Sequence, residues 1–269
     1  MIKISELYIY PVKSLAGIKV NSTKLTQLGF NNDRRWMIID KNDKFMSQRE
    51  FAHMATIKTA FKNNQLVLSH QDSQMIVPDS NHNKKIRVTI WKDSIPASHV
   101  SEDVDIWLSN ILNTHCRLVY MENDDNRQID KDFAPLNHFV SFADGYPILV
   151  ISQASMDDLN DRLPIPVDIN RFRPNMVVTG TSAFAEDQWQ ELSINNIDLK
   201  AVKTCARCIM PSINQESGKQ DQLNMLATLN KFRKIDNKIK FGQNLIYKDV
   251  NQINNHIISC GDLVNLRNV

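Results

Sequence analysis

Two cysteines three residues apart form the stretch of this sequence best suited to chemistry. In residues 204–218 (TCARCIMPSINQESG), Cys205 and Cys208 enclose Ala206 and Arg207, and a loop rich in Pro, Asn and Gly follows. Such a pair can be half of a zinc site, a redox dithiol, a disulfide, or the source of one thiolate for another metal. Because Arg207 lies beside Cys208, we expect its positive charge to lower the pKa of that thiol.

The rest of the sequence does not complete the first three sites. A structural zinc site needs four ligands, whereas Cys116 and Cys260 stand alone on strand-like stretches and the nearest downstream histidine is His256. A thioredoxin-like dithiol should open a helix, and Pro211 discourages one here. A disulfide is disfavoured in a reducing compartment. Spacing alone leaves two interpretations open: one reactive thiolate facing a soft metal, or two small buried side chains in a strand turn.

Basic and amide side chains recur at turns beside predicted strands. Arginine's planar fork suits a phosphate group held at two points, and neutral amides and hydroxyls add hydrogen bonds to an anion. Taken singly, each of these residues also fits a solvated surface position. The candidates for an anionic ligand are Lys13, Ser14, Arg34, Arg171, Arg173, Asn175 and Asn244.

Composition excludes several classes of protein. The chain has 269 residues, of which 42% are hydrophobic and 23% charged, with a net charge of +2. These values are ordinary for a globular protein and give no reason to expect nucleic acid or a membrane as partner. The N-terminus lacks a signal-peptide pattern, and four cysteines are too few for a disulfide scaffold. We therefore expect a cytoplasmic, reduced protein.

The elements that must position these residues are mainly strands. Period-two patterns predict strands at residues 3–11, 35–40, 86–91, 116–121, 147–152, 175–180, 197–203, 241–247 and 262–267, and a hairpin at 41–50. Helical patterns cover residues 101–112, with Ser101 as cap, then 152–163 and 221–232, the last with Leu223 on its apolar face. Strands without regularly alternating helices predict an α+β fold that is predominantly antiparallel.

A polar, acidic stretch at residues 121–131 (MENDDNRQIDK) is the best candidate for a linker or long surface loop. It divides the chain into a predicted β-barrel-like domain at residues 1–120 and a second β-barrel domain at residues 121–269, with a few peripheral helices. The sequence contains no detectable repeat.

Six segments, in this order along the chain, resemble one known family. They are YPVKSLAG, GFNNDRRWMIID, FADGYPILVIS, NRFRPNM, CARCIMPSINQESG and FGQNLIY. The sequence resembles the MOSC proteins that carry the family's N-terminal β-barrel domain, and within them the mitochondrial amidoxime-reducing component and its bacterial relatives. The resemblance spans nearly the whole chain.

The resemblance implies that the second domain binds the molybdenum cofactor, a molybdenum ion held by the dithiolene sulfurs of a pterin (Mo-molybdopterin). The cysteine after arginine in the motif, Cys208, is then the metal ligand and the catalytic residue. Cys205 is then not a ligand, and either lies next to the ligand shell or is structural. Contacts to the pterin and its phosphate are implied for Lys13, Ser14, Arg34, Arg173 and Asn175, and less closely for Gly145, Tyr146, Ala206, Arg207 and Asn244. The family often has serine in place of Ala206, so a hydroxyl contact is lost there.

The implied function is reduction of N-hydroxylated compounds such as amidoximes and hydroxylamines. We assign no general acid, and we expect Asp168 and Asp187 to be surface carboxylates. Some bacterial relatives carry a ferredoxin domain with four cysteines, which this sequence lacks, so electrons are expected from a separate flavin reductase with a ferredoxin or cytochrome. One alternative is a MOSC protein that carries the cofactor or sulfur without turnover. Another is a zinc-binding or purely structural β-protein.

Overall fold

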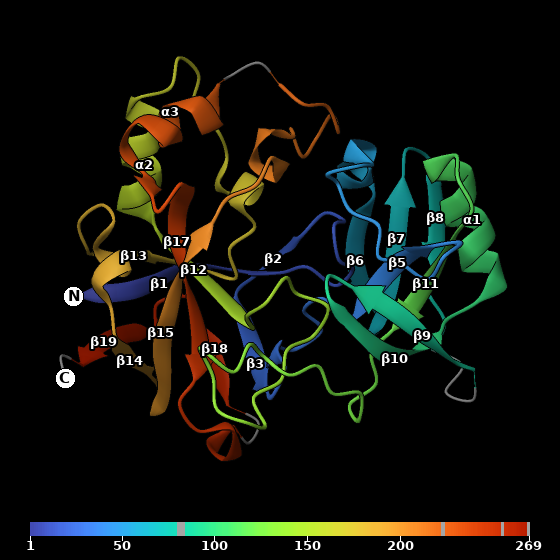
Figure 1. Cartoon of the computed structure of the whole chain (residues 1–269), viewed down its shortest axis with the longest axis horizontal. Helices are drawn as coiled ribbons and strands as arrows, with labels where there is room; N and C mark the ends of the chain where they lie inside the picture. The colour runs from blue at the N-terminus through green and yellow to red at the C-terminus, as the bar shows by residue number, and fades with distance from the viewer. Residues whose placement is uncertain (80–83, 222–223, 254–255, 268–269) are drawn as a thin grey trace.

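A closed barrel of seven strands forms the larger lobe of the molecule (Figure 1). The computed structural model describes residues 1–79, 84–221, 224–253 and 256–267. Within these ranges the barrel strands follow the order β12-β13-β1-β19-β14-β15-β17, and β17 pairs back onto β12. Their bounds are β1 Ile2–Ile9, β12 Ile148–Ser152, β13 Met176–Thr179, β14 Glu191–Ile194, β15 Ile197–Ala206, β17 Lys238–Tyr247 and β19 Leu263–Arg267.

The side chains that point inward from the barrel strands fill the interior of the barrel. Neighbouring strands run antiparallel except β12 and β13, which are parallel with Val150 opposite Met176. Because successive side chains point to opposite faces, Leu7, Val150, Met176 and Leu245 meet in one buried apolar core. Ring closure leaves each of the seven strands paired on both sides, which removes exposed edges. The predicted α+β, predominantly antiparallel fold is confirmed.

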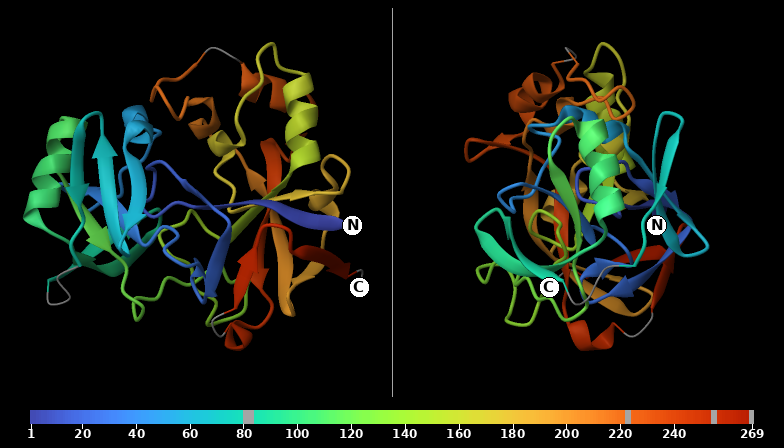
Figure 2. Two further views of the ribbon diagram at one scale, coloured as in Figure 1. Left: turned by 180° about the vertical axis from the view of Figure 1, so that it is seen from behind. Right: turned by 90° about the vertical axis from the view of Figure 1, so that its right-hand side faces the viewer.

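The second lobe contains two smaller antiparallel sheets. One has the order β5-β11-β10-β9 and the other β6-β7-β8, and helix α1 packs beside β11. Both chain ends lie on the barrel lobe, away from these sheets (Figure 2). The bounds are β5 Trp36–Asp40, β6 Lys58–Lys62, β7 Gln65–His70, β8 Ser73–Ile76, β9 Lys85–Ile90, β10 Asp93–His99, β11 Cys116–Tyr120 and α1 Glu102–Leu112.

The first thirty residues belong to the barrel lobe. β1 pairs with β13 and β19, and β2 (Ile18–Val20) extends β1 on its other end. β3 (Ser22–Thr26) pairs with β18 (Ile257–Ser259) and with β4 (Gly29–Phe30). The sheets therefore cross the predicted boundary at residue 120, and the division into domains 1–120 and 121–269 stays a prediction.

Three α-helices occur in the described part of the chain. Ser101 caps α1 by accepting a hydrogen bond from Asp103 N, as predicted, and Ser152 caps α2 (Gln153–Asp161) in the same way from Ser155 N. The third helix was predicted from residue 221, but α3 spans Met225–Phe232. That prediction is wrong at its start because Asn224 has a left-handed backbone (φ 50°), which ends any helix before it. Leu223 lies outside the described residues.

Short elements complete the chain. They are β16 Lys234–Ile235 and the 3₁₀ turns η1 Ala52–Thr56, η2 Ile169–Phe172, η3 Ala185–Gln188, η4 Met210–Ser212 and η5 Val250–Gln252. Across the described residues, no helix has both the length and the apolar character needed to cross a membrane.

The polar stretch after β11 is packed against the second lobe. Asp125 and Arg127 are each about 95% buried, because Asp125 pairs with Lys85 at 2.6 Å and Arg127 pairs with Asp93 at 2.8 Å. Ile129 is buried in an apolar cluster. The segment is therefore a structured connection and not a free linker. Its polar composition does not reveal this, because its charged side chains are buried only by pairing with residues of β9 and β10.

Candidate functional site

All eleven residues predicted for the site line one pocket between the two lobes. They are Lys13, Ser14, Arg34, Gly145, Tyr146, Arg173, Asn175, Ala206, Arg207, Cys208 and Asn244. Arg171 and Cys205 line it as well. The pocket thus joins the segment after β1, the loop before β12, the turn before β13, the end of β15 and the middle of β17. The roles of these residues toward a cofactor remain predictions, whereas the structure shows that the fold brings all of them to one pocket.

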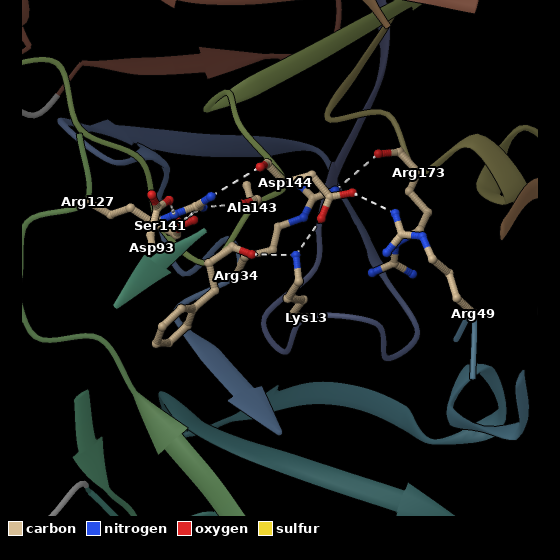
Figure 3. A network of polar contacts seen from close by, with 10 residues as sticks. Lys13, Arg34, Arg49, Asp93, Arg127, Ser141, Ala143, Asp144 and Arg173 are labelled. Carbon is tan, nitrogen blue, oxygen red and sulfur yellow. Dashed lines mark hydrogen bonds and ion pairs between the residues drawn. The ribbon is translucent and has the colours of Figure 1, made fainter. Parts of the chain in front are cut away.

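Lys13 is a buried cation at the floor of the pocket (Figure 3). Its backbone is fixed by a hydrogen bond from Lys13 N to Trp36 O at 2.8 Å. Its ammonium group donates to Phe142 O at 2.8 Å and to Asp144 Oδ1 at 2.5 Å. Burial lowers the pKa of Lys13 to about 8, against the opposing attraction of Asp144. Lys13 therefore loses its charge at a pH close to neutrality.

Asp144 is the carboxylate that faces this pocket. Its second oxygen lies 3.4 Å from Arg49 Nη2, and its side chain stays 57% exposed toward the open space. Burial opposes ionisation, but Lys13 and Arg49 outweigh it and hold the pKa of Asp144 well below its usual range. Asp144 therefore carries a negative charge at neutral pH.

Arg127 holds the loop that carries Asp144. Its side chain is buried and pairs through Nε with Asp93 Oδ2 at 2.8 Å. Its other nitrogens donate to the carbonyls of Ser141 (3.2 Å), Ala143 and Asp144 (3.2 Å), as Figure 3 shows. One side chain thus provides hydrogen bonds to three backbone carbonyls of a loop that does not form strand-to-strand hydrogen bonds at these residues.

Two arginines stack on one buried tyrosine. The guanidinium carbons of Arg34 and Arg173 each lie 4.2 Å from the ring centroid of Tyr10. Arg34 donates to Asp33 Oδ2 at 2.6 Å and to Asn175 Oδ1 at 3.1 Å. Arg173 donates to Leu15 O at 2.7 Å. Burial, and then repulsion from Arg34, lower the pKa of Arg173 to about 10.

Three pocket residues hold a backbone conformation that favours glycine. Ser14 has φ 67°, Arg34 has φ 49° and Arg173 has φ 56°. Each left-handed residue with a side chain costs on the order of 1 kcal/mol or more, so the surrounding packing must enforce it. All three residues line the pocket.

Cys205 and Cys208 occupy different settings. Cys205 ends β15, where burial raises the pKa of its thiol and the charge of Arg207 partly offsets that rise. Arg207 itself donates to Phe241 O at 2.9 Å and to Phe172 O at 3.0 Å. The guanidinium that interacts with Cys208 is that of Arg49. Burial by itself lowers the pKa of Arg49, but the opposing effects of Asp144 and then Cys208 are larger, so the pKa of Arg49 is raised overall. The sequence had indicated the adjacent Arg207 as the cation at Cys208.

The other cysteines do not join the site. All four cysteines are free; Cys260 is exposed, and Cys116 is buried on β11. Burial raises the pKa of Cys116 to about 11, against a hydrogen bond from Ser109. No group of three His, Cys, Asp or Glu side chains able to hold a metal occurs among the described residues. In the part of the chain that is described, the CARC pair thus gains no further ligand of the kind a zinc site needs.

Several pocket residues escaped the sequence interpretation. Asp144 lies inside the segment FADGYPILVIS, so its place was signalled but its role was not. The same holds for Tyr10 in YPVKSLAG, which is buried behind the pocket and supports Arg34 and Arg173. Arg49 lies in the predicted hairpin and carried no signal. Asp168 is a surface residue that caps η2, as expected. Asp187 is wrongly predicted as a surface carboxylate, because it forms an ion pair with Arg233 in which both side chains are about nine-tenths buried.

The side chains that line the pocket suit an anionic ligand. Six cationic side chains and one carboxylate line it among the described residues: Lys13, Arg34, Arg49, Arg171, Arg173, Arg207 and Asp144. Arg173 and Arg207 each keep one buried Nη2 atom without a hydrogen-bond partner in the described structure. A buried donor without a hydrogen bond is energetically costly. An anionic ligand would accept hydrogen bonds from both of these Nη2 atoms. A half-buried thiol, Cys208, faces the same space.

Comparisons with known proteins agree with this geometry. Residues 1–115 match the MOSC N-terminal beta barrel domain, and residues 137–265 match the MOSC domain. The chain is 32% identical over 244 residues to mitochondrial amidoxime reducing component 2 of Bos taurus, covering 87% of this chain and 73% of that protein. It is 30% identical over 247 residues to mitochondrial amidoxime-reducing component 1 of Homo sapiens, covering 87% and 72%. It is 27% identical to a molybdenum cofactor sulfurase of Oryza sativa subsp. japonica, covering 96% of this chain but 34% of that protein.

Proposed function

Since the chain belongs to the MOSC family, in the branch with an N-terminal beta barrel domain, we propose that it is a molybdenum-cofactor-dependent reductase of N-hydroxylated compounds. The substrates are amidoximes and hydroxylamines. The observation that carries the proposal is the pocket in which Cys208 faces a cluster of arginines that retain unpaired donors. This donor set fits a phosphate-bearing pterin whose metal accepts one thiolate.

The residues of the chain divide the work of holding the cofactor. Lys13, Arg34 and Arg173 supply positive charge and fork-shaped donors for the phosphate, and Cys208 supplies the thiolate ligand. When bound, the cofactor supplies two-electron redox chemistry at molybdenum. In the overall reaction the N–O bond breaks, two electrons and two protons enter, and the oxygen leaves as water.

The chain's own residues set the electrostatics of that reaction. Arg49 lies between Asp144 and Cys208, so it holds a positive charge at the thiolate side of the pocket. Arg127 fixes the loop that carries Asp144 and keeps the carboxylate oriented. No general acid is assigned, because Lys13, with its pKa of about 8, already donates its protons to Asp144 and a backbone carbonyl.

Electrons come, in this proposal, from a separate redox protein, a flavin reductase with a ferredoxin or cytochrome. The test is to express the protein in a host that makes the cofactor, measure molybdenum per chain, and supply reduced methyl viologen with benzamidoxime. Stoichiometric molybdenum and formation of benzamidine are expected. NADH without a donor protein should give no turnover.

The sulfurase relative, which is 27% identical across 96% of this chain, supports a second function. In that case the protein carries the cofactor or its sulfur without reducing an external substrate. Stoichiometric molybdenum without benzamidine formation, with any of several reductants, would favour the carrier. Protein that contains zinc and no molybdenum would contradict both functions.

A further inference from the structure

A second, wider cavity opens beside the cofactor pocket. It has a volume of about 620 Å³ and shares Asp144, Gly145 and Tyr146 with that pocket. Its outer wall includes Trp91, Ile129 and Lys203. Its remaining lining residues are polar: Lys92, Asp93, Arg127, Gln128, Asp130 and Lys131. We call the cavity lined by these twelve residues the vestibule. A compound that enters through it reaches the cofactor pocket past Asp144.

The position of Asp144 is unusual for an anion-binding pocket. A carboxylate facing a phosphate site weakens anion binding by repulsion, and this one stays ionised and 57% exposed. Lys13 and Arg49 approach its two oxygens and leave further lone pairs toward the vestibule. An exposed carboxylate that is fixed and charged is an acceptor for a ligand's N–H group.

Trp91 forms an aromatic wall at a conformational cost. It occupies the two-residue turn between β9 and β10 with φ 55°, where glycine or asparagine is favoured. A bulky side chain in this region costs on the order of 1 kcal/mol or more. The indole packs 4.7 Å from the Phe45 ring and 4.7 Å from the guanidinium of Arg49, yet 43% of the residue is exposed. The turn therefore presents an anchored aromatic face to open space.

Tyr146 supplies a second aromatic side chain to the vestibule. Its ring meets Phe133 edge-on at 6.1 Å, and Lys203 lies 4.1 Å from the Phe133 ring. Burial raises the pKa of Tyr146 to about 12, so its hydroxyl stays neutral. The vestibule thus combines two aromatic side chains with Asp144, the carboxylate that it shares with the cofactor pocket, while a second lining carboxylate, Asp93, is paired with Arg127.

We propose that the vestibule binds the N-hydroxylated substrate, with Asp144 accepting a hydrogen bond from the substrate's N–H group and Trp91 contacting its ring. The preferred substrate is then a planar aromatic compound with a free amino group next to the N–O bond. This inference rests on the proposed reductase function and adds the residues that determine specificity. Arg49 couples the two parts, because it contacts both Trp91 and Asp144.

The test uses three substrates and the cofactor-loaded protein. Benzamidoxime has both a ring and a free amino group, acetamidoxime lacks the ring, and N,N-dimethylbenzamidoxime lacks the amino N–H. Dissociation constants are measured on oxidised protein without reductant, and KM and kcat with reduced methyl viologen. All values are referred to molybdenum content, so that altered loading does not enter the comparison.

Two variants separate the contacts. Trp91→Gly removes the ring and relieves the left-handed backbone, so the fold should survive. It is expected to reduce the preference for benzamidoxime over acetamidoxime about tenfold, the size of an aromatic contact, and Trp91→Phe should restore part of it. Asp144→Asn is expected to reduce the preference for benzamidoxime over its N,N-dimethyl derivative about tenfold, because a charge-assisted hydrogen bond becomes a neutral one.

The outcomes distinguish this inference from the proposed function. Unchanged preference ratios in both variants, with reduction still observed, would overturn the vestibule assignment and leave the reductase standing. Binding of benzamidoxime by the wild-type protein without reduction by any donor would overturn the reductase function. Ratios that fall only for the substrate pair matched to each variant would support the assignment.

Discussion

The ammonium group of Lys13 lies 2.5 Å from Oδ1 of Asp144, and the two partners differ sharply in exposure. The lysine side chain is 6% exposed and the aspartate side chain 57%. The buried cation therefore depends on an exposed anion for its charge, while burial lowers the pKa of Lys13 to about 8. This pair makes the charge of the pocket sensitive to pH.

Anion binding should weaken as the pH rises through about 8. Below that value Lys13 is charged and attracts an anion, whereas above it the free pocket must take up a proton on binding, so affinity falls. Sulfate is a suitable probe because its charge is constant over this range, and its dissociation constant can be measured by calorimetry on cofactor-free protein. Lys13→Met should bind sulfate more weakly at pH 7 and lose the pH dependence between 7 and 9. An equal slope in the variant would contradict the role given to Lys13.

The two cysteines of the CARC motif should respond differently to replacement. Cys208→Ser is expected to abolish molybdenum retention and benzamidoxime reduction, because serine does not provide a soft thiolate ligand. Cys205→Ser should keep its molybdenum, since burial raises the pKa of that thiol near the end of β15 and so disfavours a thiolate there. Elemental analysis and activity of both variants, made in the same host, decide between them. The reverse pattern would show that the ligand has been assigned to the wrong cysteine.

Arg173 should matter more for the cofactor than Arg171. Arg173 has a buried unpaired Nη2 in the pocket, whereas Arg171 is paired with Asp221 at 2.5 Å. Arg173→Lys retains the charge but loses the fork, and is expected to weaken pterin retention about tenfold. Arg171→Lys is the matched control and should change retention by less than threefold. Pterin content after dialysis is the measurement, with thermal unfolding to confirm that both variants fold. Equal retention in the two variants would remove Arg173 from the phosphate site.

Gly242 should be required where the barrel closes. It has φ +80°, and an added Cβ would lie 2.7 Å from Ile151 Cγ1 and 2.9 Å from the carbonyl oxygen of Val150 on β12. Gly242→Ala combines backbone strain with overpacking and is expected to lower the free energy of unfolding by about 3 kcal/mol. Gly145→Ala is the control, because no atom lies within 4 Å of its added Cβ, and its effect should stay within about 0.5 kcal/mol. Urea unfolding of the cofactor-free protein gives both values; a stable Gly242→Ala variant would argue against the tight seam between β12 and β17.

Local features were readable from the sequence because they depend on neighbours in the chain. The period-two strands, the Ser101 cap of α1 and the α+β class follow from alternation and from turn residues. The six ordered segments also identified the family and drew attention to Cys208. The predicted start of α3 was wrong because the sequence pattern did not indicate the left-handed backbone of Asn224.

Contacts between distant segments were decided by the tertiary structure. Arg49 reaches Asp144 across 95 positions, and Lys13 reaches it across 131. The packing of the two lobes brings these segments together at the pocket, and no periodicity within one segment encodes which charges will then face each other. The same reason explains why Asp187 became a buried partner of Arg233. The sequence by itself determined the strands, the family and the cysteine motif. The choice of Arg49 as the cation at Cys208, and of Asp144 as the carboxylate between two cavities, was decided only by the packing of segments that are distant in the sequence.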